Sequence, residues 1–118
     1  MSKIPQSERL YDLSKLRHMA GDDNAFVVRM VKMFLEQTPE SLAQIDQNFK
    51  AGNLAQVRTI SHKMKPSIDF MGIESLKNEI RQIEALADEG DPNNALPPLL
   101  KQLNAIALQV CEQLKLEL

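Results

Sequence analysis

Apolar residues recur every three or four positions along nearly the whole chain, which is the spacing of amphipathic helices. The pattern predicts a short helix over about Asp12–Ala20, with Asp12 as its N-cap, and a long helix over roughly Asp23–Lys50. Three further apolar stripes follow over residues 54–71, 73–87 and 99–118. We expect each stripe to be the buried face of one helix.

The predicted core positions are the apolar members of these stripes, together with Thr38. They are Leu13, Leu16, Ala20, Val27, Val31, Phe34, Thr38, Leu42, Ile45, Phe49, Leu54, Val57, Ile60, Met64, Ile68, Met71, Ile73, Leu76, Ile80, Ile83, Ala87, Leu99, Leu103, Ile106, Val110, Leu114 and Leu118.

Glycine and proline mark where these helices end. The chain has four glycines, Gly21, Gly52, Gly72 and Gly90, and each lies between two stripes. Glycine is favoured just after a helix because it adopts the left-handed conformation easily, so four such ends imply five helices. The stripe of the second helix keeps its phase across Pro39, which favours one long, kinked helix there.

The linkers between the four long stripes are only a few residues long, and short linkers favour antiparallel neighbours. The predicted fold is therefore all-α, an antiparallel up-down-up-down four-helix bundle with a short additional N-terminal helix. A chain of 118 residues fits a single domain, here residues 1–118.

Composition and charge exclude several classes of function. Fourteen basic against sixteen acidic residues give a net charge of −2, and aromatic residues make up only 4%. Duplex DNA binding needs clustered positive charge and single-strand binding needs stacking side chains, so we expect no nucleic-acid partner. No secretory h-region lies in residues 1–6 and no apolar run is long enough to cross a bilayer, so we expect a cytoplasmic protein without membrane contact. The lone Cys111 fits a structural thiol in a reducing compartment.

Candidate chemistry is concentrated on the third predicted helix, around His62. At helical pitch His62 points about 150° away from the centre of the apolar stripe, so it is exposed. Arg58 and Lys65 lie one turn before and after it on the same side, and Lys63 adds positive potential nearby. Two cations favour a neutral imidazole with a free lone pair and would face a bound phosphoryl group, so the arrangement suits a phosphoryl acceptor.

Other interpretations of these residues stay open from spacing alone. An exposed histidine among basic residues usually belongs to a solvated helix face without a chemical role. Ser61 points about 100° away from His62, which argues against a hydrolytic triad. His18 suits the C-terminal end of the first helix, where the helix dipole favours a cation, and no second histidine lies at metal-ligand spacing. We therefore expect neither a metal nor a cofactor. The methionines at helical spacing, Met19, Met30, Met33, Met64 and Met71, fit core packing.

The sequence resembles the histidine-containing phosphotransfer (HPt) domains of bacterial two-component phosphorelays. Their signature is an exposed histidine followed by Lys at +3, Gly at +4 and Ser at +5, which here corresponds to His62, Lys65, Pro66 and Ser67. The similarity extends over about residues 9–115. It includes Tyr11-Asp12-Leu13-Ser14-Lys15-Leu16, Ala20-Gly21-Asp22, Phe34-Leu35-Glu36-Gln37-Thr38-Pro39, Ala51-Gly52-Asn53, and Met71-Gly72 with Leu76.

This resemblance implies that His62 accepts a phosphoryl group from the aspartate of a response-regulator receiver domain and passes it on, with Lys65 stabilising the phosphohistidine. Arg58, Lys63, Pro66, Ser67 and Asp69 are expected to support the site. Mg²⁺ is expected only in the partner receiver domain, and a hybrid sensor kinase is a further possible partner.

The sequence departs from the signature at Pro66, where a proline lacks the N–H that would bond the carbonyl of His62, so a looser or kinked helix is expected there. The alternative function is a non-catalytic helical adapter that docks on a kinase or regulator. We expect a monomer, because four helices can close one core.

Overall fold

The computed structural model describes residues 9–118, and in this part of the chain it contains five helices and no strand. The helices are α1 (Ser14–Ala20), α2 (Asn24–Lys50), α3 (Leu54–Phe70), α4 (Glu74–Glu89) and α5 (Leu96–Lys115). The predicted number and order of helices are therefore confirmed. The expectation for residues 1–6 lies outside the described residues.

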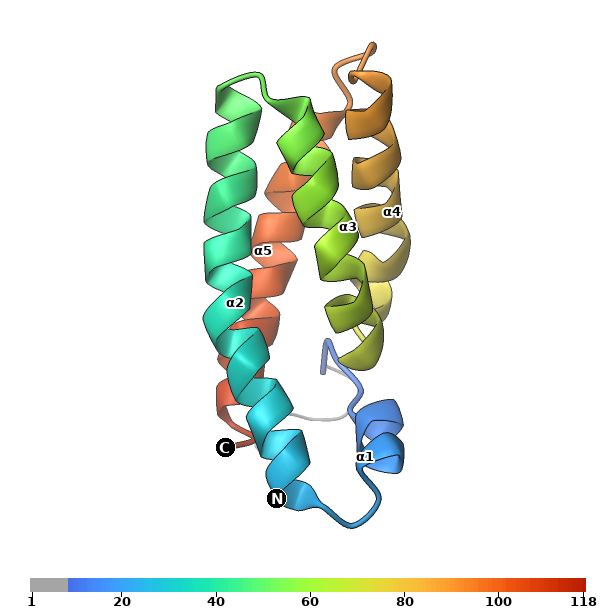
Figure 1. The fold of residues 1–118 in the computed structure, drawn as a ribbon. Helices are drawn as coiled ribbons and strands as arrows, with labels where there is room; N and C mark the ends of the chain where they lie inside the picture. The colour runs from blue at the N-terminus through green and yellow to red at the C-terminus, as the bar shows by residue number, and fades with distance from the viewer. Residues whose placement is uncertain (1–8) are drawn as a thin grey trace.

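The four long helices form an antiparallel bundle, and α1 packs beside the N-terminal end of α2 (Figure 1). The molecule measures 46 × 24 × 20 Å. Around the bundle α2 packs against α3, α3 against α4, α4 against α5, and α5 against α2. Helices α3 and α5 therefore occupy diagonal corners. The up-down-up-down topology is the predicted one, because each connection is only a short turn.

Local sequence explains where the helices begin. The side chain of Asp23 accepts a hydrogen bond from the N–H of Phe26 at the start of α2, and Asn53 does the same for Gln56 at the start of α3. These are N-caps that satisfy donors left unpaired in the first turn. Helix α2 continues through Pro39, as its unbroken apolar stripe predicts.

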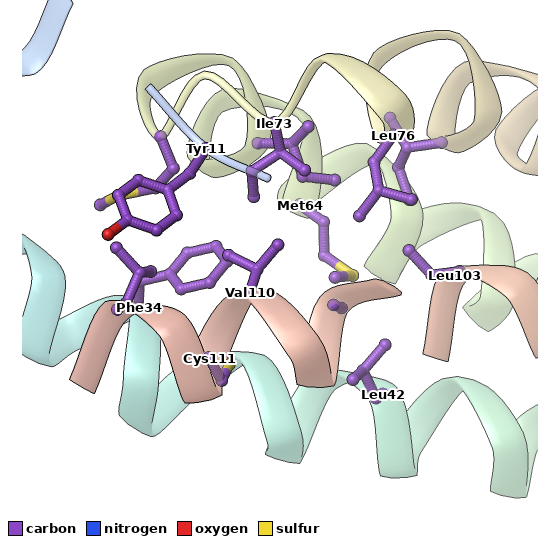
Figure 2. Packing of buried hydrophobic residues seen from close by; sticks show 14 of the residues in the cluster. Tyr11, Phe34, Leu42, Met64, Ile73, Leu76, Leu103, Val110 and Cys111 are labelled. Carbon is purple, nitrogen blue, oxygen red and sulfur yellow. The ribbon is translucent and has the colours of Figure 1, made fainter. Parts of the chain in front are cut away.

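The core is one cluster to which all five helices contribute (Figure 2). Figure 2 shows Phe34 of α2, Met64 of α3, Leu76 of α4 and Val110 of α5 directed into it, and Tyr11 joins them from the segment before α1. Cys111 is also buried, and burial raises the pKa of its thiol. A buried thiol in this packing is structural, as predicted.

Three predictions about the packing and the first helix are wrong in detail. Helix α1 begins at Ser14 rather than Asp12, although the Asp12 carboxylate does accept a hydrogen bond from the N–H of Ser14. Leu118 is exposed because α5 ends at Lys115, before the stripe reaches it. Met19 and Met33 are 59% and 41% exposed, so they are surface residues rather than core.

The turn between α3 and α4 is fixed by a close approach of the backbone at Gly72. Gly72 has φ +62°, and a Cβ there would meet the backbone of Asp12 within contact distance. The N–H of Asp12 donates to the carbonyl of Met71 at 2.9 Å. Only glycine fits this left-handed, crowded position. The segment before α1 thus contacts the turn of the α3–α4 hairpin and helps to fix the position of α4 against α3. The candidate site lies between these two helices.

None of the helices in residues 9–118 combines the length and the apolar character that a membrane span needs.

Candidate functional site

His62 projects from the solvent side of α3, and its side chain is 66% exposed. The opposite side of the helix is held by the buried residues Val57, Ile60, Met64 and Ile68. Ser61 is buried and donates its hydroxyl hydrogen bond to the carbonyl of Val57, so it does not serve His62. The predicted exposure of His62 and the absence of a Ser61–His62 pair are both confirmed.

A carboxylate on the neighbouring helix holds the His62 ring. Nδ1 of His62 lies 2.5 Å from Oε2 of Glu84 on α4, and Nζ of Lys65 donates to Oε1 of the same carboxylate at 2.8 Å. A carboxylate only accepts hydrogen bonds, so Nδ1 carries the proton in this contact. In a neutral ring the other nitrogen, Nε2, then has a free lone pair.

The same contacts keep Glu84 ionised. The hydrogen bond from Lys65 is the main reason that the pKa of Glu84 lies below its ordinary value, and the hydrogen bond from His62 acts in the same direction. Partial burial of the carboxyl opposes them. An ionised Glu84 is the acceptor that fixes the Nδ1–H tautomer of His62.

The two cations that flank His62 along α3, Arg58 and Lys65, are not free, which corrects the sequence-based expectation. Nε of Arg58 lies 3.1 Å from Oδ1 of Asp88 on α4, and Lys65 is paired with Glu84. His62 therefore lies in a row of alternating charges along the α3–α4 seam rather than in a purely cationic patch. Reasoning from one helix at a time could not count the charges on the next helix.

Asp69 lies further along the same seam and takes part in a separate ion pair. Its Oδ2 accepts from Nη2 of Arg81 at 3.0 Å, and Arg81 also donates to the carbonyl of Lys77. None of the contacts described for Asp69 reaches His62. In this structure Asp69 links α3 to α4 instead of supporting the imidazole.

The other three predicted supporting residues, Lys63, Pro66 and Ser67, line the side of α3 that faces α2. Lys63 and Ser67 border a groove against Gln37, Ser41 and other α2 residues. Pro66 and Ser67 border a second groove of about 190 Å³, whose other walls are Met30, Met33, Phe34, Gln37, Phe70 and Met71. Helix α3 is not interrupted at Pro66. The groove at Lys63 is thus lined mainly by polar residues, whereas the groove at Pro66 is largely apolar.

Glu84 is the site residue that sequence reasoning missed, although a signal for it exists. Reflecting the hairpin about Ile73 in the turn places Glu84 opposite His62 and Asp88 opposite Arg58. An antiparallel helix pair with so short a turn has little freedom of register. The matching four-residue spacing of Arg58 and His62 on α3, and of Glu84 and Asp88 on α4, could therefore have predicted the two contacts.

Taken together, the site offers an exposed imidazole that is held at Nδ1 by Glu84 and lies next to a lysine on a pair of packed helices. Among residues 9–118 no group of three or more His, Cys, Asp or Glu side chains is placed to hold a metal ion. The His62 imidazole can act as a nucleophile toward an electrophile presented by another molecule, and Lys65 is close enough to face an incoming anion.

Comparisons with known proteins agree with this chemistry. The sequence profile of the Hpt domain family matches residues 29–116, which is 88 of the 118 residues. The chain is 27% identical over 71 residues to the phosphorelay intermediate protein YPD1 of Candida albicans, a match covering 60% of this chain and 39% of that protein. The chain thus spans well under half of the curated relative's length.

The fold is similar to the crystal structure of histidine-containing phosphotransfer protein B (HptB) from Pseudomonas aeruginosa. The TM-score is 0.79 at 22% sequence identity, and the match covers 93% of this chain and 95% of the other.

Proposed function

The chain belongs to the Hpt domain family, and on that premise we propose that it serves as a histidine phosphotransfer intermediate in which His62 accepts and passes on the phosphoryl group. The observation that carries this proposal is the hydrogen bond from Nδ1 of His62 to Glu84, which leaves Nε2 as the nucleophile.

The proposed step needs no proton transfer. The lone pair of Nε2 attacks the phosphorus of an aspartyl phosphate, the N–P bond forms, and the P–O bond to the aspartate breaks with its electron pair leaving on the carboxylate. The ring keeps its proton on Nδ1 and gains a positive charge, which the ionised Glu84 faces directly. The reverse step returns the phosphoryl group to a second aspartate along the same path.

Lys65 has two possible partners in this scheme. Without a phosphoryl group it is bonded to Glu84, and its side chain is 24% exposed, so its ammonium can also reach solvent beside the ring. A phosphoryl group on Nε2 brings about two negative charges to this position and attracts a neighbouring ammonium. We assign Lys65 to stabilising the phosphohistidine, with Glu84 as a positioning residue for the ring.

The partner is proposed to be a response-regulator receiver domain, either free-standing or within a hybrid sensor kinase. The apolar groove bordered by Met30, Met33, Pro66 and Phe70 offers it a docking surface beside His62. Phosphoryl transfer depends on in-line placement and charge stabilisation, so the acceptor needs little beyond a positioned nucleophile. Mg²⁺ and the acidic pocket are expected on the receiver, and the reducing cytoplasm suits the free, buried Cys111.

The test is phosphate uptake from phosphorylated receiver domains, followed by intact-protein mass spectrometry at neutral or alkaline pH. Wild type and His18→Gln should gain a phosphoryl group, and His62→Gln should gain none while its unfolding free energy changes by no more than about 0.5 kcal/mol. Uptake that persists in His62→Gln would contradict the assignment. A wild-type protein that binds receivers but takes no phosphoryl group from any of them would favour the adapter function.

A further inference from the structure

We propose that the outer face of α5 binds the same face of a second copy of this chain, with the two helices antiparallel, to form a reversible dimer. This face lies on the opposite side of the bundle from the exposed side of α3, because α3 and α5 occupy diagonal corners. Its members are exposed or only partly buried: Pro97, Lys101, Asn104, Ala105, Leu108, Gln109, Glu112 and Leu116.

The strongest support is that this face is complementary to itself. A two-fold axis that runs between the two copies of α5, at the level between Ile106 and Ala107, pairs residues whose numbers add to 213. Lys101 then lies at the level of the partner's Glu112, and Ala105 at the level of the partner's Leu108. Each contact occurs twice, as the symmetry of an isologous interface requires.

The other exposed residues of α5 lie at the margins of this face. Asn104 and Gln109 lie on opposite flanks of it, as Pro97 and Leu116 do, so the proposed contacts are those of Lys101, Ala105, Leu108 and Glu112. Lys115 falls at the level of the partner's Pro98, so the pairing brings no two like charges together. At helical pitch Lys101, Ala105, Leu108 and Glu112 lie within about 60° of one another, so a single helix face presents them.

The shape of the surface fits this arrangement. Leu108 is 42% exposed and stands between two hollows, both of which it helps to line. One hollow, of about 500 Å³, lies against α2 beside Pro39 and Ala43. The other, of about 600 Å³, is bordered by Ala105, Gln109 and Glu112. The small side chain of Ala105 leaves room for the partner's Leu108, which is the knob-into-hole contact of paired helices.

The charges of this face are available for pairing. In the described part of the chain no carboxylate lies within ion-pair distance of Lys101. Glu112 is bonded to Lys115 at 2.9 Å, but both side chains are more than half exposed, so this pair rearranges at little cost. The apolar part of the surface is small, so we expect a weak, reversible dimer rather than an obligate one. It leaves both copies of His62 open, and it replaces the expectation of a strict monomer.

The test is sedimentation velocity on the full chain from low micromolar to millimolar concentration. Wild type should shift with concentration from the 13.3 kDa monomer toward twice that mass. Lys101→Glu and Glu112→Lys should each raise the dissociation constant of the dimer about tenfold or more, because each reversal creates two like-charge contacts. The double variant Lys101→Glu/Glu112→Lys should recover the dimer, since it restores both pairs with the charges exchanged.

Lys32→Glu is the matched control, because Lys32 is an exposed lysine on α2. It should dimerise like wild type, and circular dichroism of all variants should show the same helix content. A chain that stays monomeric across the whole range overturns the proposal. So does a dimer that tolerates Lys101→Glu, which would place the contact on another face, or a folded double variant that fails to recover association.

Discussion

Two glutamates on α4 experience opposite environments. Glu84 faces α3, where it bonds to Lys65 and His62, and these contacts lower its pKa. Glu79 is only 7% exposed, its Oε1 has no hydrogen-bond partner in the described structure, and burial raises its pKa. At helical pitch the two side chains lie on opposite flanks of the apolar stripe of α4.

This difference distinguishes a carboxylate that serves the site from one that only lowers the stability of the fold. The ionised Glu84 has partners that use its charge, so it is part of the site. Glu79 has no partner to offset the loss of its hydration, so its charge destabilises the fold. Burial alone therefore does not make a carboxylate a candidate for function. It is a candidate when neighbouring groups bind its charge, as at Glu84, and not when the charge is unpaired, as at Glu79.

The largest expected effect comes from changing the turn that sets α4 against α3, because both glutamates depend on it. Gly72→Ala should lower the unfolding free energy by about 2–5 kcal/mol, since it combines a left-handed backbone with a clash against Asp12. Gly52→Ala is the matched control: Gly52 also has positive φ, but nothing lies within 4 Å of a Cβ there. It should cost only about 1–2 kcal/mol. Urea unfolding of both variants measures the difference, and equal losses would contradict the close approach at Gly72.

Glu84→Gln should reduce the rate of phosphoryl transfer about tenfold, which corresponds to about 1.4 kcal/mol, because the ring loses its charged acceptor. The folded pKa of Glu84 is depressed, so its stabilising effect is present above the unfolded pKa and is lost as the pH falls through the folded pKa. The stability difference between wild type and Glu84→Gln should therefore shrink toward zero in acid. A variant that transfers at the wild-type rate would remove Glu84 from the site.

Glu79→Gln should show the opposite stability change. The folded pKa of Glu79 is raised, so its ionisation destabilises the fold once the pH exceeds the unfolded pKa. The variant should be about 1 kcal/mol more stable than wild type at neutral pH, the lower end of what an unpaired buried polar group costs. The gain should vanish at acid pH, and phosphoryl transfer should be unchanged. Thermal melts at several pH values test this, and a loss of stability at neutral pH would mean that Glu79 has a stabilising partner.

The smallest expected effect is at the cations. Lys65→Ala should slow transfer several-fold rather than abolish it, because a single exposed charge contributes about 0.2–1 kcal/mol. Arg58→Ala should change the rate less, since Arg58 is engaged by Asp88 one turn away. Stopped-flow transfer rates compare the two directly. If Arg58→Ala is the slower variant, the stabilising cation is Arg58.

The comparison also shows what sequence could predict. Periodicity along each helix correctly predicted the buried stripes and the exposed position of His62, because both depend only on helical pitch. The partners of His62 and Arg58 come from α4 and depend on the register between two helices, which Gly72 and Asp12 fix through a contact distant in sequence. The buried, unpartnered state of Glu79 depends on tertiary packing in the same way, so the periodicity of α4 does not predict it.

The most direct test of the central claim is nitrogen NMR of the His62 ring before and after phosphorylation. We expect a neutral ring with its proton on Nδ1 in the free protein, and a phosphoryl group on Nε2 afterwards. In Glu84→Gln the preference for the Nδ1–H tautomer should weaken. A proton on Nε2 in the free wild-type protein, or a phosphoryl group on Nδ1, would contradict the account.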